Sequence, residues 1–417
     1  MAQLGSDNLA SGEKTLRIEE ATALLLRTPC LAGVETVALA EAEGRVLAEP
    51  LLAPINLPGF DNSAVDGYAV RFDDLMAQGE TVLVVDGRAT AGHPLCRAPP
   101  RGCAVRIFTG AVMPDGMDTV FMQEDCRIHE NGAVVLPNGL KRSANRRLAG
   151  EDVAKGSIAL ERGRLLRPED VGLAAALGVS RLPVRRRLKA AIFSTGDEIL
   201  APGEDLRPGA IYDANRFMLH SLLRRAGVEV TDLGMLRDDQ DSMGLALQSA
   251  ARAHDLVLTS GGVSVGEEDH VKAAITNEGS LSFWRLAIKP GRPVAMGAIG
   301  ETPFVGLPGN PVAVFVTFVA VVRPLIAALS GAKFEPARGL PIASGFSYKK
   351  KKGRREYVRA FLREDTDRRI IAEKHPVEGA AVLTSLTRTQ GFVELPEEVE
   401  RIAPGDPVDF IAYDLVR

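Results

Sequence analysis

Carboxylate-rich loops that contain glycine occur at several separate places along this 417-residue chain. The first is PGFDNSAVDGYAV, residues 58–70, which has two aspartates, an asparagine and a serine between Phe60 and Tyr68. Such side chains hydrogen-bond to nearby backbone and favour turns, so a plain turn is the simplest interpretation. A set of functional residues is the alternative, and the remaining motifs must decide between the two.

Four further acidic groups stand where loops are expected to leave regular elements. Acids at solvated helix starts are one explanation, because they complement the helix dipole. Carboxylates beside glycines would also suit Mg²⁺, which prefers oxygen ligands and is commonly shared with substrate phosphates. The four groups are Glu151-Asp152, Asp197-Glu198, Asp238-Asp239 and Glu267-Glu268-Asp269.

Basic residues recur in the later part of the chain. Lys289 and Arg292 lie in IKPGRPV, and Arg354, Arg355 and Arg359 lie in KKKKGRREYVR. A solvated charged face is one interpretation of the second stretch. A phosphorylated substrate bound together with a divalent metal would use the acidic and the basic residues at once.

Two loops rich in small residues follow predicted strands. TGDEI, 195–199, follows KAAIFS, and GGVSVGEED, 261–269, follows DLVLTS. Small residues let a ligand approach the backbone. Neither loop matches a P-loop or G-x-G-x-x-G, which disfavours a dinucleotide dehydrogenase. A third loop, GLPGNPV at 306–312, turns before a long apolar segment, and stiffening of that turn is the simplest role for its prolines.

The elements that must position these loops alternate between residues 183 and 330. Alternating strands and helices predict a parallel sheet with right-handed crossovers. Ligands bind at the carboxyl ends of the strands in such sheets. Strands are expected at 188–193, 228–233 and 255–260, with helices at 215–226 and 241–253.

The flanking segments predict three further units. Helical spacing over residues 15–27 predicts a helix that ends before Pro29. Short apolar runs separated by glycine and proline predict a mostly β domain. A second segment with the same pattern of short runs begins after Gly331. A helix beginning at Pro168 is expected to close back onto the N-terminal helix. The predicted domains are 8–54 with 146–182, an inserted β domain at 55–145, an α/β domain at 183–332, and a C-terminal β domain at 333–417.

Composition narrows the class of protein. The net charge of −4 and the pI near 6.0 argue against a general nucleic-acid or membrane-surface binder. Four scattered cysteines without C-x-x-C support neither a disulfide framework nor a zinc site, and a cytoplasmic location is expected. The apolar stretch 312–329 is interrupted by Arg323 and Pro324, so a buried helix is expected rather than a membrane span.

The order and texture of the motifs resemble those of the MoeA family of molybdopterin molybdotransferases, which includes the E domain of gephyrin. The resemblance runs from about residue 15 to the C-terminus. It is carried by PGFDNSAVDGYAV, RIFTGAVMP, RRLAGEDV, FSTGDEI, IYDANR, RDD, LTSGGVSVGEEDH, FWRLAIKPGRP and GLPGNPV.

This resemblance implies an L-shaped subunit with a discontinuous first part, an inserted β domain, a molybdopterin-binding α/β domain and a C-terminal β barrel. The implied reaction inserts molybdenum from molybdate into adenylylated molybdopterin and releases AMP, with Mg²⁺ assisting. A homodimer with the site between subunits is implied, with a molybdopterin adenylyltransferase as the pterin donor and with no nucleic acid or membrane as partner.

Site residues are implied motif by motif. The implied catalytic residues are Asp66, Thr109, Asp152, Glu198, Asp238 and Asp269, of which Glu198 and Asp269 are also the implied metal ligands. Molybdate is a tetrahedral dianion and needs convergent cationic donors. The implied substrate-binding residues are Ser260, Gly261, Gly262, Ser264, Lys289, Arg292, Pro308, Pro311, Arg354, Arg359 and Ser385.

Two departures from the family pattern concern the molybdate contacts. Arg285 and Arg292 stand where many relatives have lysine, which keeps the charge but changes the donor geometry. EGAAVLTS, which ends in Ser385, lacks the Ser-His of some relatives. Two other functions are possible. A molybdopterin adenylyltransferase would lack the inserted domain and the DNSAxDGYA loop, which this chain has. A scaffold would need no intact carboxylates, yet all the expected ones are present here.

Overall fold

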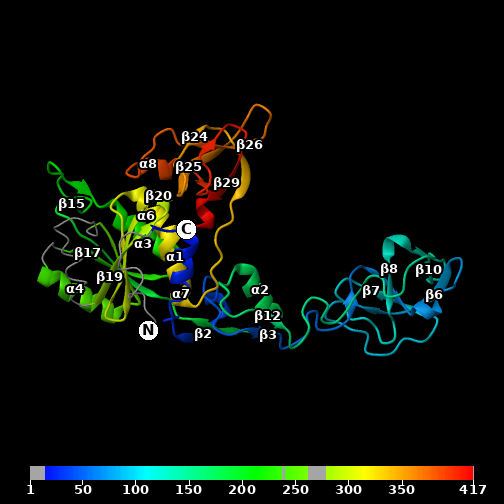
Figure 1. Ribbon diagram of the computed structural model, residues 1–417. Coiled ribbons are helices and arrows are strands. Elements are labelled where there is room, and N and C mark those ends of the chain that lie inside the picture. The colour runs from blue at the N-terminus through cyan, green and yellow to red at the C-terminus, as the bar shows by residue number, and fades with distance from the viewer. Residues whose placement is uncertain (1–14, 237–239, 262–278, 417) are drawn as a thin grey trace.

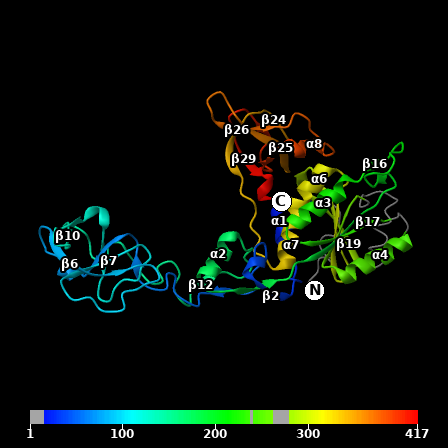
Figure 2. The ribbon, with the colours of Figure 1, turned by 180° about the vertical axis from the view of Figure 1, so that it is seen from behind.

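The computed structural model describes residues 15–236, 240–261 and 279–416. The chain is elongated and L-shaped. An α/β part and a C-terminal barrel lie together, and a separate β sheet lies at the far end of a thin arm (Figure 1). The view from behind shows the same separation (Figure 2).

A small region built from two distant stretches of sequence forms the base of the arm. β2 (Val34–Ala38) pairs with β13 (Arg181–Arg185), and β3 (Leu51–Leu52) pairs with β12 (Ile158–Leu160), both antiparallel. α2 (Pro168–Ala176) begins at the predicted proline, because a proline at the first helical position loses no hydrogen bond. The chain therefore leaves for the inserted sheet and returns from it along paired strands.

The inserted sheet has the strand order β8-β5-β7-β6-β10-β9. Neighbouring residues on a strand face opposite sides, and both sides are covered: Ala69 packs in one apolar cluster and Val70 in another. A short ladder of β4 (Asn62–Ser63) and β11 (Arg146–Arg147) lies beside the sheet. The six strands are β5 (Gly67–Val70), β6 (Thr81–Ala89), β7 (Cys103–Ile107), β8 (Thr119–Met122), β9 (Arg127–Ile128) and β10 (Val134–Leu136).

The α/β sheet has seven strands in the order β1-β19-β21-β22-β18-β14-β17. Helices cover both faces, which explains why the inner strands β14 and β18 are buried along nearly their whole length and are mostly apolar. Ile192 of β14 packs against α3 (Ala214–Arg225), and Phe193 faces the cluster of α4 (Gln240–Ala253). The strands are β1 (Thr15–Leu16), β14 (Lys189–Ser194), β17 (Glu229–Met235), β18 (Leu256–Ser260), β19 (Gly279–Leu286), β21 (Pro293–Ile299) and β22 (Thr302–Leu307).

The long apolar segment forms one continuous helix in the core. It comprises α6 (Pro311–Thr317), a π-helical turn at Phe318–Val322, and α7 (Arg323–Ser330). The 20-residue segment is apolar on average and long enough to cross a membrane, yet 83% of its most apolar 18-residue stretch is buried inside the protein. It packs beside α1 (Ile18–Leu25) in the largest core cluster, as the sequence predicts for a buried helix.

The C-terminal region is a closed five-strand barrel. Its strands run in the order β25-β26-β23-β29-β27, and the pairing of β25 with β27 closes it. β20 (Ile288–Lys289), which comes from the α/β part of the sequence, adds to β25 and ties the barrel to the sheet. The barrel strands are β23 (Leu340–Ser344), β25 (Arg355–Glu364), β26 (Ile370–Lys374), β27 (Gly391–Leu395) and β29 (Pro407–Ala412).

Two predictions about regular structure are wrong in part. The α/β sheet is mixed rather than parallel, because β21 runs antiparallel to both β19 and β22. The two-residue turn Gly300-Glu301, with Gly300 at φ +58°, makes β21 and β22 a hairpin. The predicted helix at 15–27 begins later, since Thr15 and Leu16 pair with β19 before α1 starts.

Candidate functional site

The structure brings Asp66 and Thr109 together on the inserted domain. Asp66 Oδ1 accepts hydrogen bonds from the Thr109 backbone N–H and from Thr109 Oγ1, both at 2.8 Å. The backbone bond, the hydroxyl bond and the nearby charge of Arg106 lower the pKa of Asp66. The result is an ionised, half-buried carboxylate, with only one of its oxygens used by these bonds.

The other polar residues of the DNSAVDGYA turn shape the turn. Asp61 accepts hydrogen bonds from the Ala149 N–H at 2.7 Å and from Arg146 Nε at 3.0 Å. The Ser63 hydroxyl donates to the Val65 carbonyl at 2.6 Å. Because a Cβ on Gly67 would lie 1.7 Å from the Phe121 carbonyl oxygen, only glycine fits there. The turn interpretation therefore holds for these residues, whereas Asp66 points its carboxylate at a second loop.

Asp152 lies near the base of the arm, apart from this pair. Its backbone N–H donates to the Leu57 carbonyl at 3.0 Å, and the neighbouring Gly150 N–H donates to the Pro58 carbonyl at 2.9 Å. The Asp152 side chain is exposed and makes no hydrogen bond or ion pair within the described residues. The structure thus places Asp152 where the inserted domain is attached and not in contact with Asp66.

The carboxyl edge of the α/β sheet gathers buried hydroxyl groups. Ser194 and Ser260 are opposite each other at the ends of β14 and β18, and the Gly261 N–H donates to the Leu307 carbonyl of β22 at 3.2 Å. The hydroxyls of Ser194, Thr195 and Ser260 are buried and have no hydrogen-bond partner among the residues that the structure describes. These are the polar groups that a ligand at this edge could satisfy.

Glu198 lies beside the same edge, in the loop after β14. Its side chain is exposed and folds back toward Gly196, where an added Cβ would lie 2.7 Å from a Glu198 carboxylate oxygen. Within the described ranges no group of three or more His, Cys, Asp or Glu could hold a metal. Four predicted site residues lie outside the described residues: Asp238, Gly262, Ser264 and Asp269.

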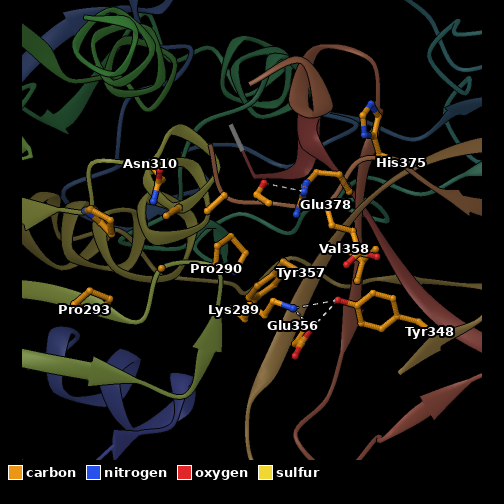
Figure 3. Close-up of a pocket in the computed structure, with 16 residues that line it drawn as sticks. Lys289, Pro290, Pro293, Asn310, Tyr348, Glu356, Tyr357, Val358, His375 and Glu378 are labelled. Carbon is orange, nitrogen blue, oxygen red and sulfur yellow. Dashed lines mark hydrogen bonds and ion pairs between the residues drawn. The ribbon is translucent and has the colours of Figure 1, made fainter. Parts of the chain in front are cut away.

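A cavity of about 600 Å³ lies between the α/β domain and the barrel (Figure 3). Lys289, Pro308 and Arg359, all predicted as substrate-binding residues, line it. Lys289 comes from β20 and Arg359 from β25, so the pairing of these two strands brings the cations to one cavity.

Lys289 is held by a buried acid. Lys289 Nζ lies 3.3 Å from Glu356 Oε2, and the Tyr348 hydroxyl donates to the same oxygen at 2.8 Å. Arg354 Nε donates to the other Glu356 oxygen at 2.8 Å. Glu356 is 1% exposed, and burial of its carboxylate requires such partners. Burial and the neighbouring Glu356 raise the pKa of Tyr348, so its hydroxyl stays protonated.

Arg359 is held on the opposite side of the cavity. Its Nε donates to Ser385 Oγ and its Nη2 donates to the Gly379 carbonyl, both at 3.1 Å. Ser385 Oγ donates onward to the Val382 carbonyl at 2.6 Å. Burial lowers the pKa of Arg359, but a guanidinium stays charged at any ordinary pH. Arg359 and Ser385, each predicted separately as a substrate-binding residue, are thus in direct contact.

Four of the predicted substrate-binding residues near the cavity do not line it. Arg354 and Ser385 contact the lining residues Glu356 and Arg359, and Arg292 and Pro311 lie elsewhere. The Arg292 side chain is exposed, and its backbone carbonyl accepts from the Leu286 N–H at 2.8 Å. Pro311 begins α6. In contrast, Tyr348, Glu356 and His375 line the cavity without having been predicted. The only sequence signal for Glu356 is that it is the single acid within the basic run KKKKGRREYVR. An acid in such a position can form ion pairs with the neighbouring basic residues.

The described chain does not assemble these residues into one site. The inserted sheet that carries Asp66 lies at one end of the molecule, and the Lys289 cavity and the hydroxyl edge lie at the other (Figures 1 and 2). A single subunit therefore presents three separated groups of candidate residues: a half-buried carboxylate, a hydroxyl-lined sheet edge and a cation-lined cavity.

Models of three domain families match successive parts of the chain. Residues 16–178 match the MoeA N-terminal region (domain I and II), residues 191–328 match a probable molybdopterin binding domain, and residues 342–413 match the MoeA C-terminal region (domain IV). Together these matches extend over most of the described chain.

Curated proteins and solved structures agree with these matches. Molybdopterin molybdenumtransferase of Haemophilus influenzae is 40% identical over 396 residues, covering 94% of this chain and 97% of that protein. Molybdopterin molybdenumtransferase 2 of Mycobacterium tuberculosis is 35% identical over 381 residues, covering 89% and 93%. The crystal structure of the molybdopterin biosynthesis MoeA protein of Pyrococcus horikoshii OT3 matches with a TM-score of 0.81 at 30% identity, covering 96% of this chain and 100% of that one.

Proposed function

The chain belongs to the molybdopterin molybdenumtransferase family, and on that basis we propose that it inserts molybdenum into adenylylated molybdopterin. In this proposal the protein takes up molybdate and releases AMP during molybdenum cofactor biosynthesis. The observation that carries it is the cavity where Lys289 and Arg359 converge from paired strands.

Molybdate is assigned to this cavity because its charge and shape match the donors. A tetrahedral dianion accepts several hydrogen bonds, and charge-assisted bonds are the strongest available to it. Hydrogen bonds to Ser385 and to the Gly379 carbonyl hold the Arg359 side chain in place, and the contact with Glu356 holds Lys289 in place. Neither cation needs to be ordered again when the anion arrives, which lowers the entropic cost of binding.

The adenylylated pterin is assigned to the carboxyl edge of the α/β sheet. This edge belongs to the segment that matches the probable molybdopterin binding domain. Buried hydroxyls of Ser194, Thr195 and Ser260 offer hydrogen bonds, and Gly261 leaves room for close approach. A ligand that satisfied these groups would remove the cost of their burial.

Mg²⁺ is assigned to carboxylates beside this edge. The exposed carboxylate of Glu198 is an oxygen donor of the kind that this cation prefers, and Asp269 is the second proposed ligand. When bound there, the cation would neutralise charge on the pyrophosphate. Glu198→Gln is expected to reduce activity at limiting Mg²⁺ and to recover part of it at high Mg²⁺. Unchanged activity at every Mg²⁺ concentration would remove Glu198 from the metal site.

Asp66 is assigned a role at the reacting groups. Thr109 fixes one carboxylate oxygen, leaves the other available and keeps the group ionised. Such a carboxylate can accept a hydrogen bond or a proton, or contact the cation. Asp66 lies on the far arm, so we propose that the protein is a homodimer in which the arm of one subunit reaches the α/β edge of its partner. Two-fold symmetry then gives two equivalent sites.

The reaction is tested by mass spectrometry of the small-molecule products. Purified protein incubated with adenylylated molybdopterin, Mg²⁺ and molybdate is expected to release AMP in proportion to the molybdenum inserted. Omission of molybdate should abolish molybdenum insertion. AMP release without insertion would indicate a hydrolase instead, and formation of adenylylated pterin from ATP would indicate an adenylyltransferase.

The shared site is tested by mixing two variants. Asp66→Asn and Glu198→Gln chains, each with strongly reduced activity alone at limiting Mg²⁺, are unfolded together, refolded in equal amounts and assayed at that Mg²⁺ concentration. If pairing is random, half of the dimers are mixed and half of their sites are intact, so about a quarter of all sites should regain activity. No recovery, although mixed dimers are shown to form, would place both carboxylates in one subunit's site or remove one from it.

The cellular setting follows from the same proposal. A molybdopterin adenylyltransferase would supply the substrate, and a cytoplasmic location would fit the absence of a disulfide framework. Co-purification with the adenylyltransferase and fractionation of cells would test both expectations.

A further inference from the structure

A second cavity, of about 710 Å³, lies where the base of the arm meets α3, α7 and the segment after α7. Nine arginines and one lysine line it, against three glutamates. It shares no lining residue with the Lys289 cavity. A concave surface with this excess of positive charge lies outside everything that the proposed reaction uses.

Part of this charge is compensated within the protein. Arg186 forms a fork with Asp255, at 2.6 and 2.7 Å, and Arg164 lies 2.8 Å from Asp170. In each of these pairs the partner carboxylate has a lowered pKa because the arginine outweighs the effect of burial. Such arginines hold the fold together and leave little charge for a ligand.

Four other arginines of the cavity have no carboxylate partner within the described ranges. The Arg185 side chain donates to the Ala32 carbonyl at 3.1 Å, and the Arg187 side chain donates to the Gly227 carbonyl at 3.3 Å. The side chains of Arg224 and Arg323 make no hydrogen bond or ion pair there. Arg224 follows a common pattern, because cations at a helix C-terminus complement the dipole, and α3 ends at Arg225. That pattern does not explain Arg323, which lies in the middle of the continuous helix 311–330.

Arg323 is the informative residue because its guanidinium is half-buried within the core helix, and a charge removed from water in this way is normally paired. Burial alone lowers its pKa, with no neighbouring acid to oppose the effect. A guanidinium cannot escape this cost by losing its proton. An anion in the cavity would supply the missing counter-charge, and Arg187 and Arg224 would share it.

We propose that this cavity binds a small oligophosphate anion. Guanidinium forks match phosphate oxygens in pairs, and several arginines around one cavity favour a ligand that carries several charges. A volume of about 710 Å³ lies in the range of small-molecule sites. An acidic polypeptide is the competing ligand, and it would need an extended groove rather than a cavity.

The test uses inorganic tripolyphosphate and isothermal titration calorimetry on the full-length protein. Native protein is expected to bind it with an affinity that falls as salt rises. Arg224→Gln and Arg323→Gln should each weaken binding about tenfold, because each removes a charge-assisted contact. Arg224 is exposed, so its variant should fold normally even if Arg323→Gln does not.

Two controls assign the binding to this cavity. Arg369→Gln removes an exposed arginine from the β25–β26 hairpin of the barrel, and Lys289→Ala alters the other cavity. Both should bind tripolyphosphate as the native protein does. The proposal is overturned if native protein does not bind tripolyphosphate, if Arg224→Gln binds it as tightly as the controls, or if an octameric aspartate peptide binds more tightly and displaces it.

Discussion

The turn around Asp66 and the cavity around Lys289 hold opposite charges in different ways. At the turn, one threonine fixes one oxygen of a half-buried carboxylate, and the other oxygen makes no hydrogen bond within the described residues. In the cavity, a buried glutamate ties down a lysine, an arginine and a tyrosine at once. The turn presents a single acid on a narrow arm, whereas the cavity is a network in which each group depends on the others.

This difference indicates which substitutions should leave the neighbouring residues undisturbed. Removing the Asp66 charge leaves its neighbours satisfied, because Thr109 can still hydrogen-bond to an amide oxygen. Removing Glu356 would leave a buried arrangement of donors without an acceptor. The turn can therefore be altered for function without loss of structure, and in the cavity only the exposed members can be altered in that way.

The largest effect is expected at Gly67, on which the turn depends. Gly67→Ala should lower the stability of the inserted domain by about 3 kcal/mol, since its Cβ would overlap the Phe121 carbonyl. Faster hydrogen exchange in peptides covering 67–70 and 119–122 would measure it. Gly172→Ala is the control, because nothing lies within 4 Å of that Cβ and alanine favours a helix interior. Equal exchange in the two variants would contradict the overlap.

A second large effect is expected for the Asp66 charge. Asp66→Asn should reduce kcat/KM for molybdenum insertion about 100-fold, the size of effect typical of a group that transfers protons or contacts developing charge. Thermal unfolding should be unchanged. Asp73→Asn, on an exposed surface of the same domain, should keep full activity. If Asp66→Asn is as active as Asp73→Asn, the turn is structural only.

A moderate effect distinguishes the two cations of IKPGRPV. Lys289→Ala should raise the molybdate concentration for half-maximal activity about tenfold, because Lys289 lines the cavity. Arg292→Ala should raise it less than about twofold, as expected for a screened surface charge. Equal shifts, or a larger shift for Arg292→Ala, would place the molybdate outside the cavity.

The smallest effect concerns the pKa of Asp66. Thr109→Val removes the hydroxyl bond but keeps the backbone bond, so the pKa should rise part of the way toward its ordinary value of 3.8. Because the folded-state value is lowered, ionised Asp66 stabilises the protein above pH 3.8, and this contribution is lost as the pH falls through the folded-state value. Carbon-13 NMR titration would detect the rise. An unchanged titration would mean that the backbone N–H alone lowers the pKa.

The sequence predicts those parts of the molecule whose signal is local. The strand before TGDEI, the helix beginning at Pro168 and the buried helix after GLPGNPV are found as predicted, because apolar periodicity and proline act within a few residues. The β21–β22 hairpin was missed, since a Gly-Glu turn inside an apolar run gives a weak signal. Glu356 was missed because a single acid in a basic run looks solvated, and only the fold reveals its burial.

The sequence also does not predict contacts between residues that are far apart along the chain. Motif matching proposes Asp66 and Thr109 separately, yet their contact across 43 residues requires the fold. Arg359 and Ser385 are a similar pair, 26 residues apart. Conversely, Arg292 lies three residues after Lys289 in the sequence but outside the cavity, because the chain turns at Pro290-Gly291 between the end of β20 and the start of β21.

The paired strands at the base of the arm also set an order for synthesis. β2 ends at Ala38, and its partner β13 begins only at Arg181. At about 5–20 residues per second, a ribosome needs roughly 7 to 30 seconds to make the intervening chain. The inserted sheet is complete within that interval, and its two apolar clusters are made by its own residues, so we expect it to fold before β13 is made. β2 and β3 have no partner strands during this time. A nascent chain stalled after residue 150 is therefore expected to carry a folded arm on an unfolded base, and it should need a chaperone there until β13 emerges.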